Sequence, residues 1–419
     1  MFATELPKEQ LRREWACIKR RERRNLAIAL GLTALVFLFC MCWRYNAMYY
    51  GSGERFIPIQ YAKSLWLALR LLIANLFQLP FSGQGEALIG AMDSVIYYGA
   101  LARLKLTALS LVAGAALAIS GAVFQTAYRN PMASPNMLGA TAGVKLGNVL
   151  VVMIYSAQAY NHIILRYEYC YGLTALCVGG VLLLGHLAGG KHDYSIMEMV
   201  MAGSIVSQTL NVFTMYIMYN MEEEDILLYQ EISMGMDIDL SAVSMGLFFG
   251  VMAISLIPVL LCRWRMNAIG MDRTEAVTTG VSVGPLRMVA QICGVLMVTC
   301  AMIHCGEAGM LSMVIPYIVR NIVGADFRKV CIYSAVSGGI LMMLCRLLTS
   351  FFLIEGEPIP ITFFMNLILT PIFMIILTRQ SKKNNDQSER GGRGRGGMGG
   401  MRGMGMGGMG MGGMGGGMR

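Results

Sequence analysis

The sequence predicts an all-α membrane protein of about ten transmembrane helices, one of them short or re-entrant, with both termini in the cytoplasm. Of the 419 residues, 56% are hydrophobic and only 14% are charged, whereas soluble domains carry roughly 25% charged residues. The mean hydropathy is +0.56. Apolar windows of about 20 residues, long enough to cross the hydrocarbon core, recur along most of the chain. This composition excludes an ordinary soluble domain.

Ten windows follow one another in the sequence, and the eighth is the short one. They lie at 25–43, 106–127, 136–156, 171–189, 196–219, 241–261, 288–304, 309–323, 330–353 and 361–378. We therefore divide the chain into a basic N-terminal segment at 1–24, a membrane domain at 25–378 and a tail at 379–419.

The charge distribution predicts the orientation of these spans. Ten spans put both termini on one side, and basic residues favour the cytoplasmic side of a membrane. The run Lys19–Arg24 and the arginines of the tail place both ends inside, together with Arg129 and the loop Arg263–Arg287. The acidic run Glu222–Asp225 then falls outside. The net charge of +9 is explained by topology and does not predict a nucleic-acid partner.

The sequence shows no catalytic or metal-binding pattern. No P-loop is present, since the only GGK sequence, ending at Lys191, is followed by His192. The four histidines are dispersed, and the eleven cysteines are scattered as in an apolar core. We therefore expect no metal or cofactor on this chain and no enzyme activity. If ATP drives transport, another chain hydrolyses it.

A polar stretch, "FQTAYRNPMASPNMLGATAG", separates the second apolar window from the third. Pro131 and Pro135 disfavour helix in the residues before them, so one helix should end near Ala127 and the next should begin near Asn136. Irregular backbone at a membrane is tolerated where protein or water surrounds it. The stretch predicts the inner mouth of a pathway, whose candidate residues are Gln125, Arg129, Asn130, Pro131, Pro135, Gly139, Gly143 and Lys145.

Three sequence blocks resemble one family of transporters. The first block, Gly114–Gly143, is similar to the signature of permease subunits of type II ABC importers for iron-siderophore, haem and cobalamin. The second block, Gly309–Val330, resembles a further motif of that family, and the third block, Met201–Leu210, resembles its L-A-G-x-x-x-S motif. The residues that carry the resemblance in the second block are Gly309, Pro316, Arg320, Gly324, Asp326 and Arg328.

The resemblance implies ten-span subunits that form a homodimer or pseudo-dimer in the bacterial plasma membrane. It also implies two cytoplasmic ATPase subunits, which bind ATP and Mg, and an extracytoplasmic substrate-binding protein. The chain departs from the family pattern at Tyr317, Phe327 and Lys145. A lysine within an apolar span suggests a functional role, but its stem could also carry the ammonium group to water. Arg346 poses the same alternatives.

The loop Arg263–Arg287 resembles the segment through which this family contacts its ATPases. Asp272 can cap a short helix, Glu275 can reach back to that cap, and Gly280 can end the helix. The predicted coupling residues are Asp272, Arg273, Glu275, Ala276 and Gly280. The alternative is a solvated connector.

Two further segments receive assignments. The family places docking arginines before the second span, where this chain has Arg103 and Lys105, so these residues either dock the binding protein or anchor the helix at the interface. The tail from about Ser381 is dominated by glycine, arginine and methionine, and we expect it to be disordered. Binding of Cu(I), anionic lipid or RNA are alternatives for the tail.

The leading prediction is the permease of an ATP-driven importer for iron-siderophore, haem or cobalamin-like chelates. The alternative is a secondary transporter or channel driven by an ion gradient. Such a protein is expected to carry acidic or histidine residues within several spans, and the spans here hold few. A membrane enzyme ranks third. The resemblance leaves the chelate open, because the binding protein does most of the selecting.

Overall fold

The computed structural model describes residues 8–42, 94–156, 163–189, 196–235, 240–269, 283–307, 309–354, 357–376 and 378. The described residues are mainly helical. In chain order the elements are α1 (Lys8–Cys42), α4 (Ser94–Ala127), η1 (Pro135–Leu138), α5 (Ala140–Tyr155), α6 (Ile163–Gly189), α7 (Ile196–Tyr219), α8 (Glu223–Met234), α9 (Ala242–Cys262), α10 (Met266–Ile269), α12 (Val283–Cys305), α13 (Gly309–Val323) and α14 (Phe327–Phe351).

After α14, the two-residue strands β1 (Leu353–Ile354) and β2 (Glu357–Pro358) pair antiparallel. An apolar helix, Ile361–Ile376, follows them. The chain divides into two compact units within this helix, Met1–Leu369 and Thr370–Arg419. The described part of the second unit is the end of that helix.

The described helices confirm a multi-pass, all-helical membrane architecture. Six of them are long and apolar enough to cross a membrane: α1, α4, α7, α9, α12 and α14. Three shorter apolar helices, Ala140–Tyr155, Met310–Val323 and Ile361–Ile376, accompany them. At 1.5 Å per residue, α13 is only about 22 Å long, so it does not cross a hydrocarbon core of about 30 Å by itself.

The polar stretch after α4 breaks the helices as its prolines predict. The predicted end of the second span at Ala127 is confirmed. The predicted restart at Asn136 is wrong by four residues, because Pro135–Leu138 first form a 3-10 turn. Gly139 then adopts a left-handed backbone with φ 76° before α5 begins. Glycine takes this conformation without a Cβ clash.

α8 is a helix that the sequence analysis did not predict. It begins at the acidic run, which was assigned to a loop, and its first turn contains Glu223, Glu224 and Asp225. Acidic side chains at a helix N-terminus are stabilised by the helix dipole. The helix is short, and its Tyr229 and Ile232 are buried against α5. Its length of 12 residues explains why a search for apolar windows passed over it.

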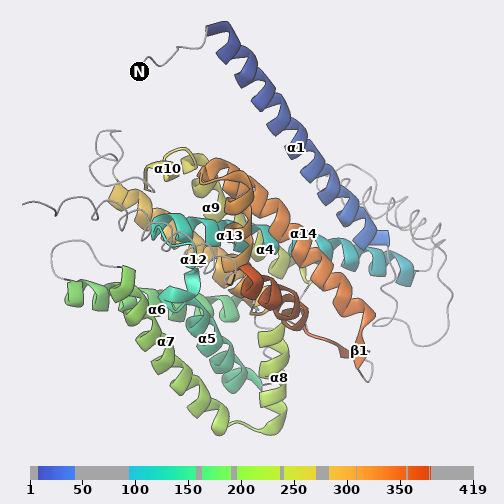
Figure 1. Cartoon of the computed structure of the whole chain (residues 1–419). Coiled ribbons are helices and arrows are strands. Elements are labelled where there is room, and N and C mark those ends of the chain that lie inside the picture. The colour runs from blue at the N-terminus through green and yellow to red at the C-terminus, as the bar shows by residue number, and fades with distance from the viewer. Residues whose placement is uncertain are drawn as a thin grey trace, which may run out of the picture. The chain divides into compact units, whose positions relative to one another are not determined.

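α4 lies at the centre of the first unit and packs against α12, α13 and α14 (Figure 1). α1 lies against α14 at the periphery, with most of its apolar span exposed. A glycine of the first block, Gly121, lets α4 and α13 approach each other closely. A Cβ built on Gly121 would lie 1.5 Å from the carbonyl oxygen of Ser312 on α13. Only a residue without a side chain lets these two backbones meet.

Buried polar side chains join α5, α6 and α12. Arg166 on α6 donates from Nε to Asn148 Oδ1 at 3.0 Å and from Nη2 to the carbonyl oxygen of Ile303 at 2.6 Å. The hydroxyl of Tyr167 is hydrogen-bonded to Nε2 of His304. Such interhelical bonds hold membrane helices together where apolar contact alone gives little preference. Among the described residues, no group of three His, Cys, Asp or Glu side chains could hold a metal ion.

Candidate functional site

The first and second blocks meet where the end of α4 packs against α13. Arg320 on α13 donates from Nη2 to the carbonyl oxygen of Ala122 at 3.1 Å and from Nε to Gln125 Oε1 at 3.2 Å. It also donates to the hydroxyl of Thr126. Gln125 returns a bond from Nε2 to the carbonyl oxygen of Met313 at 2.9 Å. Two motifs about 190 residues apart in sequence thus form one hydrogen-bonded contact.

The turn that follows α4 reaches the next part of the site. Arg129 has a positive φ of 51°, and its Nε donates to the carbonyl oxygen of Ile269 at 3.3 Å. Asn130 accepts from the backbone N–H of Met132 at 2.9 Å, which closes the turn. Pro131 is exposed and Pro135 is buried. The turn therefore connects the first block to α10.

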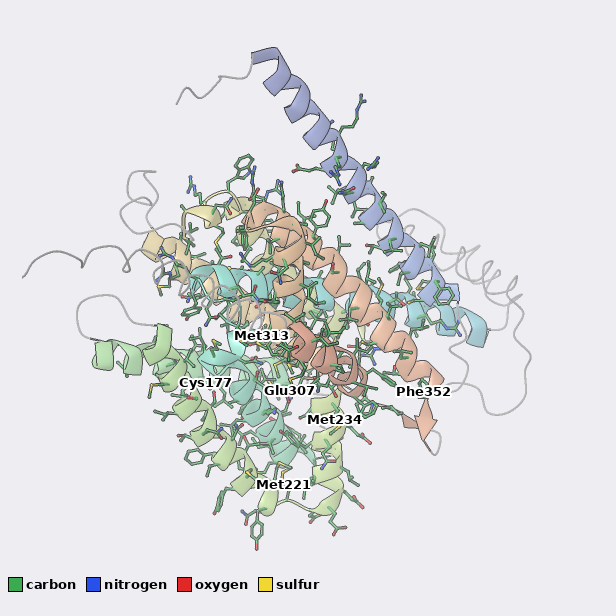
Figure 2. All side chains as sticks on the ribbon, in the orientation of Figure 1. Cys177, Met221, Met234, Glu307, Met313 and Phe352 are labelled. Atoms are coloured by element: carbon green, nitrogen blue, oxygen red, sulfur yellow. The ribbon has the colours of Figure 1, made fainter. Side chains whose placement is uncertain are left out.

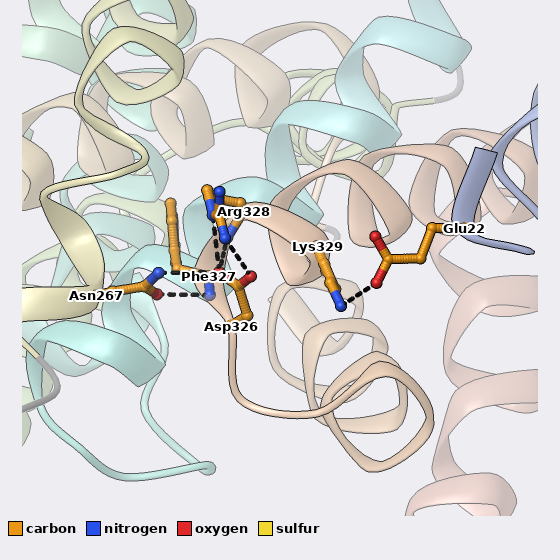
Figure 3. Close-up of polar contacts among 6 residues, drawn as sticks. All are labelled: Glu22, Asn267, Asp326, Phe327, Arg328 and Lys329. Atoms are coloured by element: carbon orange, nitrogen blue, oxygen red, sulfur yellow. Dashed lines mark hydrogen bonds and ion pairs between the residues drawn. The ribbon is translucent and has the colours of Figure 1, made fainter. Parts of the chain in front are cut away.

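Asn267 on α10 binds the beginning of α14 through both ends of its amide (Figure 3). Its Nδ2 donates to Asp326 Oδ1 at 2.9 Å, and its Oδ1 accepts from the backbone N–H of Phe327 at 2.7 Å. Asp326 is the N-cap of α14 and accepts from the backbone N–H of Arg328 at 3.2 Å. The amide thus fixes α10 against a helix terminus whose N–H groups have no partner within the helix.

Charged groups strengthen this contact. Arg328 pairs with Asp326, with 3.0 Å between Nη2 and Oδ2, and its guanidinium lies 3.9 Å from the ring centroid of Trp264. Burial alone would raise the pKa of Asp326. Hydrogen bonds from Arg328 and Asn267 and the positive charge of Arg328 together outweigh this effect, so the pKa lies below its usual value. The carboxylate is therefore ionised at neutral pH.

We call this contact the α10 junction and define it by Arg129, Trp264, Asn267, Asp326 and Arg328. The neighbouring Lys329 forms an ion pair with Glu22 of α1 (Figure 3). The described part of this segment ends at Ile269, three residues before Asp272. The predicted coupling residues, Asp272, Arg273, Glu275, Ala276 and Gly280, lie outside the described part of the chain. The junction thus holds α10, which directly precedes the segment that carries them.

Comparison with known proteins identifies the family. A family model described as the FecCD transport family matches residues 64–379. The chain belongs to the FecCD transport family. The match includes residues 64–93, where the sequence analysis placed no span and which lie outside the described residues.

Among the curated relatives, the chain is 28% identical over 293 residues to the molybdate import system permease protein of Haemophilus influenzae, covering 68% of this chain and 81% of the relative. It is 25% identical over 282 residues to a probable iron chelatin transport system permease protein of Helicobacter pylori, with 66% and 81% covered. A probable heme-iron transport system permease protein of Staphylococcus aureus is 25% identical over 280 residues, with 67% and 80% covered.

A solved structure of a metal-chelate type ABC transporter in an inward-facing conformation has the same fold. Its TM-score is 0.65 at 20% identity, and the alignment covers 85% of this chain and 99% of that chain. These matches make the protein a multi-pass plasma-membrane permease of the FecCD family. It is a transport subunit, and the family assignment describes no catalytic activity.

The FecCD motif residues of the second block have distinct structural positions. Gly309 begins α13, Pro316 lies within it, and Gly324 ends it with φ 88°. In the third block, a Cβ on Gly203 would lie 1.7 Å from the carbonyl oxygen of Met137 in η1. The glycines and the proline of these motifs therefore lie at helix ends, within α13 and at a close contact between α7 and η1.

Lys145 on α5 has a partner that the sequence analysis did not find. Its Nζ lies 2.7 Å from Oε2 of Glu307, and the two side chains are 32% and 44% exposed. Glu307 lies in the break between α12 and α13, and its backbone N–H donates to the carbonyl oxygen of Ser233 on α8 at 3.2 Å. In Figure 2, Glu307 lies between Met313 and Met221. The ion pair therefore links α5 to the break between α12 and α13, with both side chains partly exposed.

The two proposed docking residues occupy different environments. Arg103 is only 6% exposed, so its guanidinium is poorly placed for the carboxylates of a soluble partner. Lys105 is half-buried and donates from Nζ to the carbonyl oxygen of Leu240 at 2.9 Å. This arrangement argues against Arg103 as a docking residue and leaves Lys105 as a proposal.

Sequence reasoning missed Asn267 and Glu307, and each had a signal. Asn267 stands at the asparagine of the family pattern L-N-x-x-x-L-G, which the loop Arg263–Arg287 resembles. Glu307 is an acidic residue between two glycines, Gly306 and Gly309, beside the shortest apolar window. Ionisable residues beside membrane helices usually pair with an opposite charge. Lys145, whose role the sequence left open, was a candidate partner for Glu307.

Proposed function

We propose that this chain is the permease subunit of an ATP-driven importer for a metal chelate. The observation that carries the proposal is the α10 junction. It binds α10, which directly precedes residues 270–282, to the first block through Arg129 and to the second block through Asp326. A segment held in this way can pass a displacement from a partner on the membrane face to the helices that enclose the pathway.

The distribution of charge supports a cytoplasmic position for the junction. Arg129, Arg328 and Lys329 lie at the end of the bundle that holds α10, and Lys329 pairs with the basic part of α1. The acidic start of α8 lies at the opposite end (Figure 1). Under the positive-inside rule this distribution supports a cytoplasmic position for α10, where ATP is available, and is consistent with the proposed ten spans with both termini inside.

The proposed assembly follows from this orientation. Two ATPase subunits bind ATP and Mg and contact the segment 270–282. A second permease subunit, in a homodimer, completes the pathway. A substrate-binding protein docks on the opposite face, where Lys105 is the candidate contact. The permease itself binds no cofactor in this scheme, and nucleic acid has no part in it.

The proposed substrate class is an iron-siderophore, haem or cobalamin-like chelate. Relatives named for iron chelatin and for heme-iron support this class. The relative named for molybdate import adds a small oxyanion to the substrates that an experiment should include. The Lys145–Glu307 pair provides both signs of charge within the bundle, which is compatible with charged chelates.

The test is purification of the tagged chain from native membranes, followed by reconstitution in proteoliposomes. We expect a P-loop ATPase to co-purify. We also expect uptake of one labelled chelate to require ATP on the side of the proteoliposome membrane to which the cytoplasmic face of the permease is turned. Uptake that proceeds without ATP and follows a proton or sodium gradient would establish the secondary-transporter alternative instead.

A further inference from the structure

A pocket between α1, α4 and α14 is lined by two buried arginines. Arg103 comes from α4 and Arg346 from α14, and Cys40 of α1 closes a third side. The side chains of Arg103 and Arg346 are 6% and 8% exposed. A buried guanidinium group in an apolar bundle is costly unless its donors have acceptors or a negative charge accompanies it, and Arg346 is the group for which this matters.

The described residues satisfy only part of the hydrogen-bond donors of Arg346. Arg346 donates from Nη1 to the carbonyl oxygen of Gly235 at 3.5 Å, which is a long bond. Its Nε and Nη2 are buried and have no hydrogen-bond partner. The ion pairs among the described residues join Lys145, Arg328 and Lys329 to acids, and Arg346 is in none of them. A guanidinium stays charged at any physiological pH.

Ser110 of α4 adds a second orphan group to the same pocket. Its hydroxyl is fully buried and has no hydrogen-bond partner among the described residues. A hydroxyl beside two guanidinium groups can donate to an anion that they bind. Buried polar groups in native proteins are normally satisfied, so the donors of Arg346 and Ser110 together indicate a ligand with several acceptor oxygens.

We propose that this pocket binds a phosphate-type oxyanion, supplied by an anionic lipid headgroup or by free phosphate. Guanidinium groups match phosphate because two parallel N–H groups can donate to two of its oxygens. The pocket volume is about 20 Å³, and a water molecule needs roughly 10–15 Å³ by the same kind of measure. The pocket therefore admits one or two oxygens, while the rest of the group stays outside.

The position of the pocket suits a headgroup. Arg346 is five residues from the end of α14, and Cys40 is two residues from the end of α1. Along α14, Arg346 is about 27 Å from Arg328 of the α10 junction, so the pocket lies toward the opposite end of the bundle. α1 is largely exposed along its apolar span, which leaves lipid beside the pocket. Basic pockets between membrane helices on the cytoplasmic side bind lipid headgroups, and the same guanidinium chemistry is available to a headgroup at this end of the bundle.

The experiment uses the purified full-length protein in neutral detergent. Native mass spectrometry and thermal-shift measurements compare short-chain phosphatidylglycerol, short-chain phosphatidylcholine, inorganic phosphate and chloride. We expect the wild type to bind phosphatidylglycerol or phosphate, and we expect Arg346→Gln to weaken that binding about tenfold or more. Arg24→Gln, on the exposed basic part of α1, is the matched control and should bind as the wild type does.

The outcomes separate the possible ligands. Binding of phosphatidylglycerol alone identifies a lipid site, and binding of phosphate alone identifies a free-anion site. Because Arg346→Gln also alters packing, Ser110→Ala is the second variant, with an expected loss of a few-fold from one hydrogen bond. The proposal is overturned if only chloride binds, if nothing binds, or if both variants bind phosphatidylglycerol and phosphate as the wild type does.

Discussion

Lys145 on α5 and Glu307, in the break between α12 and α13, form an ion pair with 2.7 Å between Nζ and Oε2. The pair joins the sixth residue of a short helix to the irregular backbone that precedes another short helix. It also lies beside the end of α8, because Glu307 is bound to Ser233. Through Glu307 the pair therefore connects α5 with α8 and with the break before α13.

The ion pair should be measurable as a coupling between the two side chains. Lys145→Met and Glu307→Gln should each lower stability, since each leaves one charge without its partner. The double variant should be less damaged than the sum of the two, with a coupling of about 1 kcal/mol because both groups are partly exposed. Denaturation of the four proteins in detergent measures this coupling. Strict additivity would show that the pair contributes nothing.

Asp326 should make stability depend on pH in a defined direction. Its pKa is lower in the folded protein than in the unfolded chain. It therefore contributes stability at pH values above the unfolded pKa of about 3.9, and the contribution disappears as the pH falls through the lower folded pKa. Asp326→Asn keeps a good helix cap but removes this titration.

We expect the thermal midpoint of Asp326→Asn to lie below that of the wild type at neutral pH, and the difference to shrink at about pH 3. The matched variant Asn267→Ala removes two hydrogen bonds to the same cap but leaves the carboxylate and Arg328 in place. It should lower stability and weaken the pH dependence without abolishing it, because Asn267 is one of the groups that lower the pKa of Asp326 and Arg328 remains. A difference for Asp326→Asn that grows on acidification would refute the assignment.

The α4–α13 contact should not tolerate a side chain at Gly121. A Cβ at this position would lie 1.5 Å from a backbone oxygen, so Gly121→Ala must separate the two helices, at a cost of about 3 kcal/mol or more. Gly246→Ala on α9 is the control, since a Cβ there meets nothing within 4 Å. Thermal stability and monodispersity in detergent compare the two. Equal behaviour would contradict the close contact.

The sequence predicts the features that depend on composition and local backbone preference. Apolar windows locate the helices, and Pro131 explains why α4 ends at Ala127. The partners of Lys145 and Arg320 could not be predicted, because each lies more than 160 residues away and the contact exists only after the helices pack. α8 was missed for a different reason, since a helix rich in acid at its start gives no apolar window.

The burial of Arg103 shows a further limit of sequence reasoning. The position of Arg103 before the second span suggested a docking or anchoring cation, but the side chain lies among α1, α4 and α14. Which way a helical side chain points depends on the neighbours that cover it, and α1 is distant in sequence. Asn267 lies within a loop that the sequence analysis singled out. Its role could not be predicted, because it binds the start of α14, 59 residues later.

The tail is predicted to be dispensable for transport. Residues from Ser381 onward are rich in glycine and cannot form a packed surface that offsets the entropy of ordering. Deleting Ser381–Arg419 should therefore leave membrane insertion, dimerisation and ATP-dependent uptake close to wild type. The measurement is uptake normalised to the amount of protein in the membrane. A large loss of uptake at normal expression would assign the tail a function.

The central claim is that ATP hydrolysis by a partner reaches the pathway through the segment that begins at the α10 junction. Ala276→Pro should break the short helix predicted there, at a cost of about 3 kcal/mol, without changing any span. Thr274→Pro is the matched control, because the first turn of a helix tolerates proline. Both variants should insert and dimerise.

The decisive measurement is ATP-driven uptake in proteoliposomes, recorded together with the ATPase rate in the presence of loaded binding protein. We predict that Thr274→Pro transports as the wild type does. Ala276→Pro should lose uptake, and its ATPase subunits should either dissociate or hydrolyse ATP without responding to the loaded binding protein. Normal uptake by Ala276→Pro would contradict the account and move the coupling contact to the turn around Arg129.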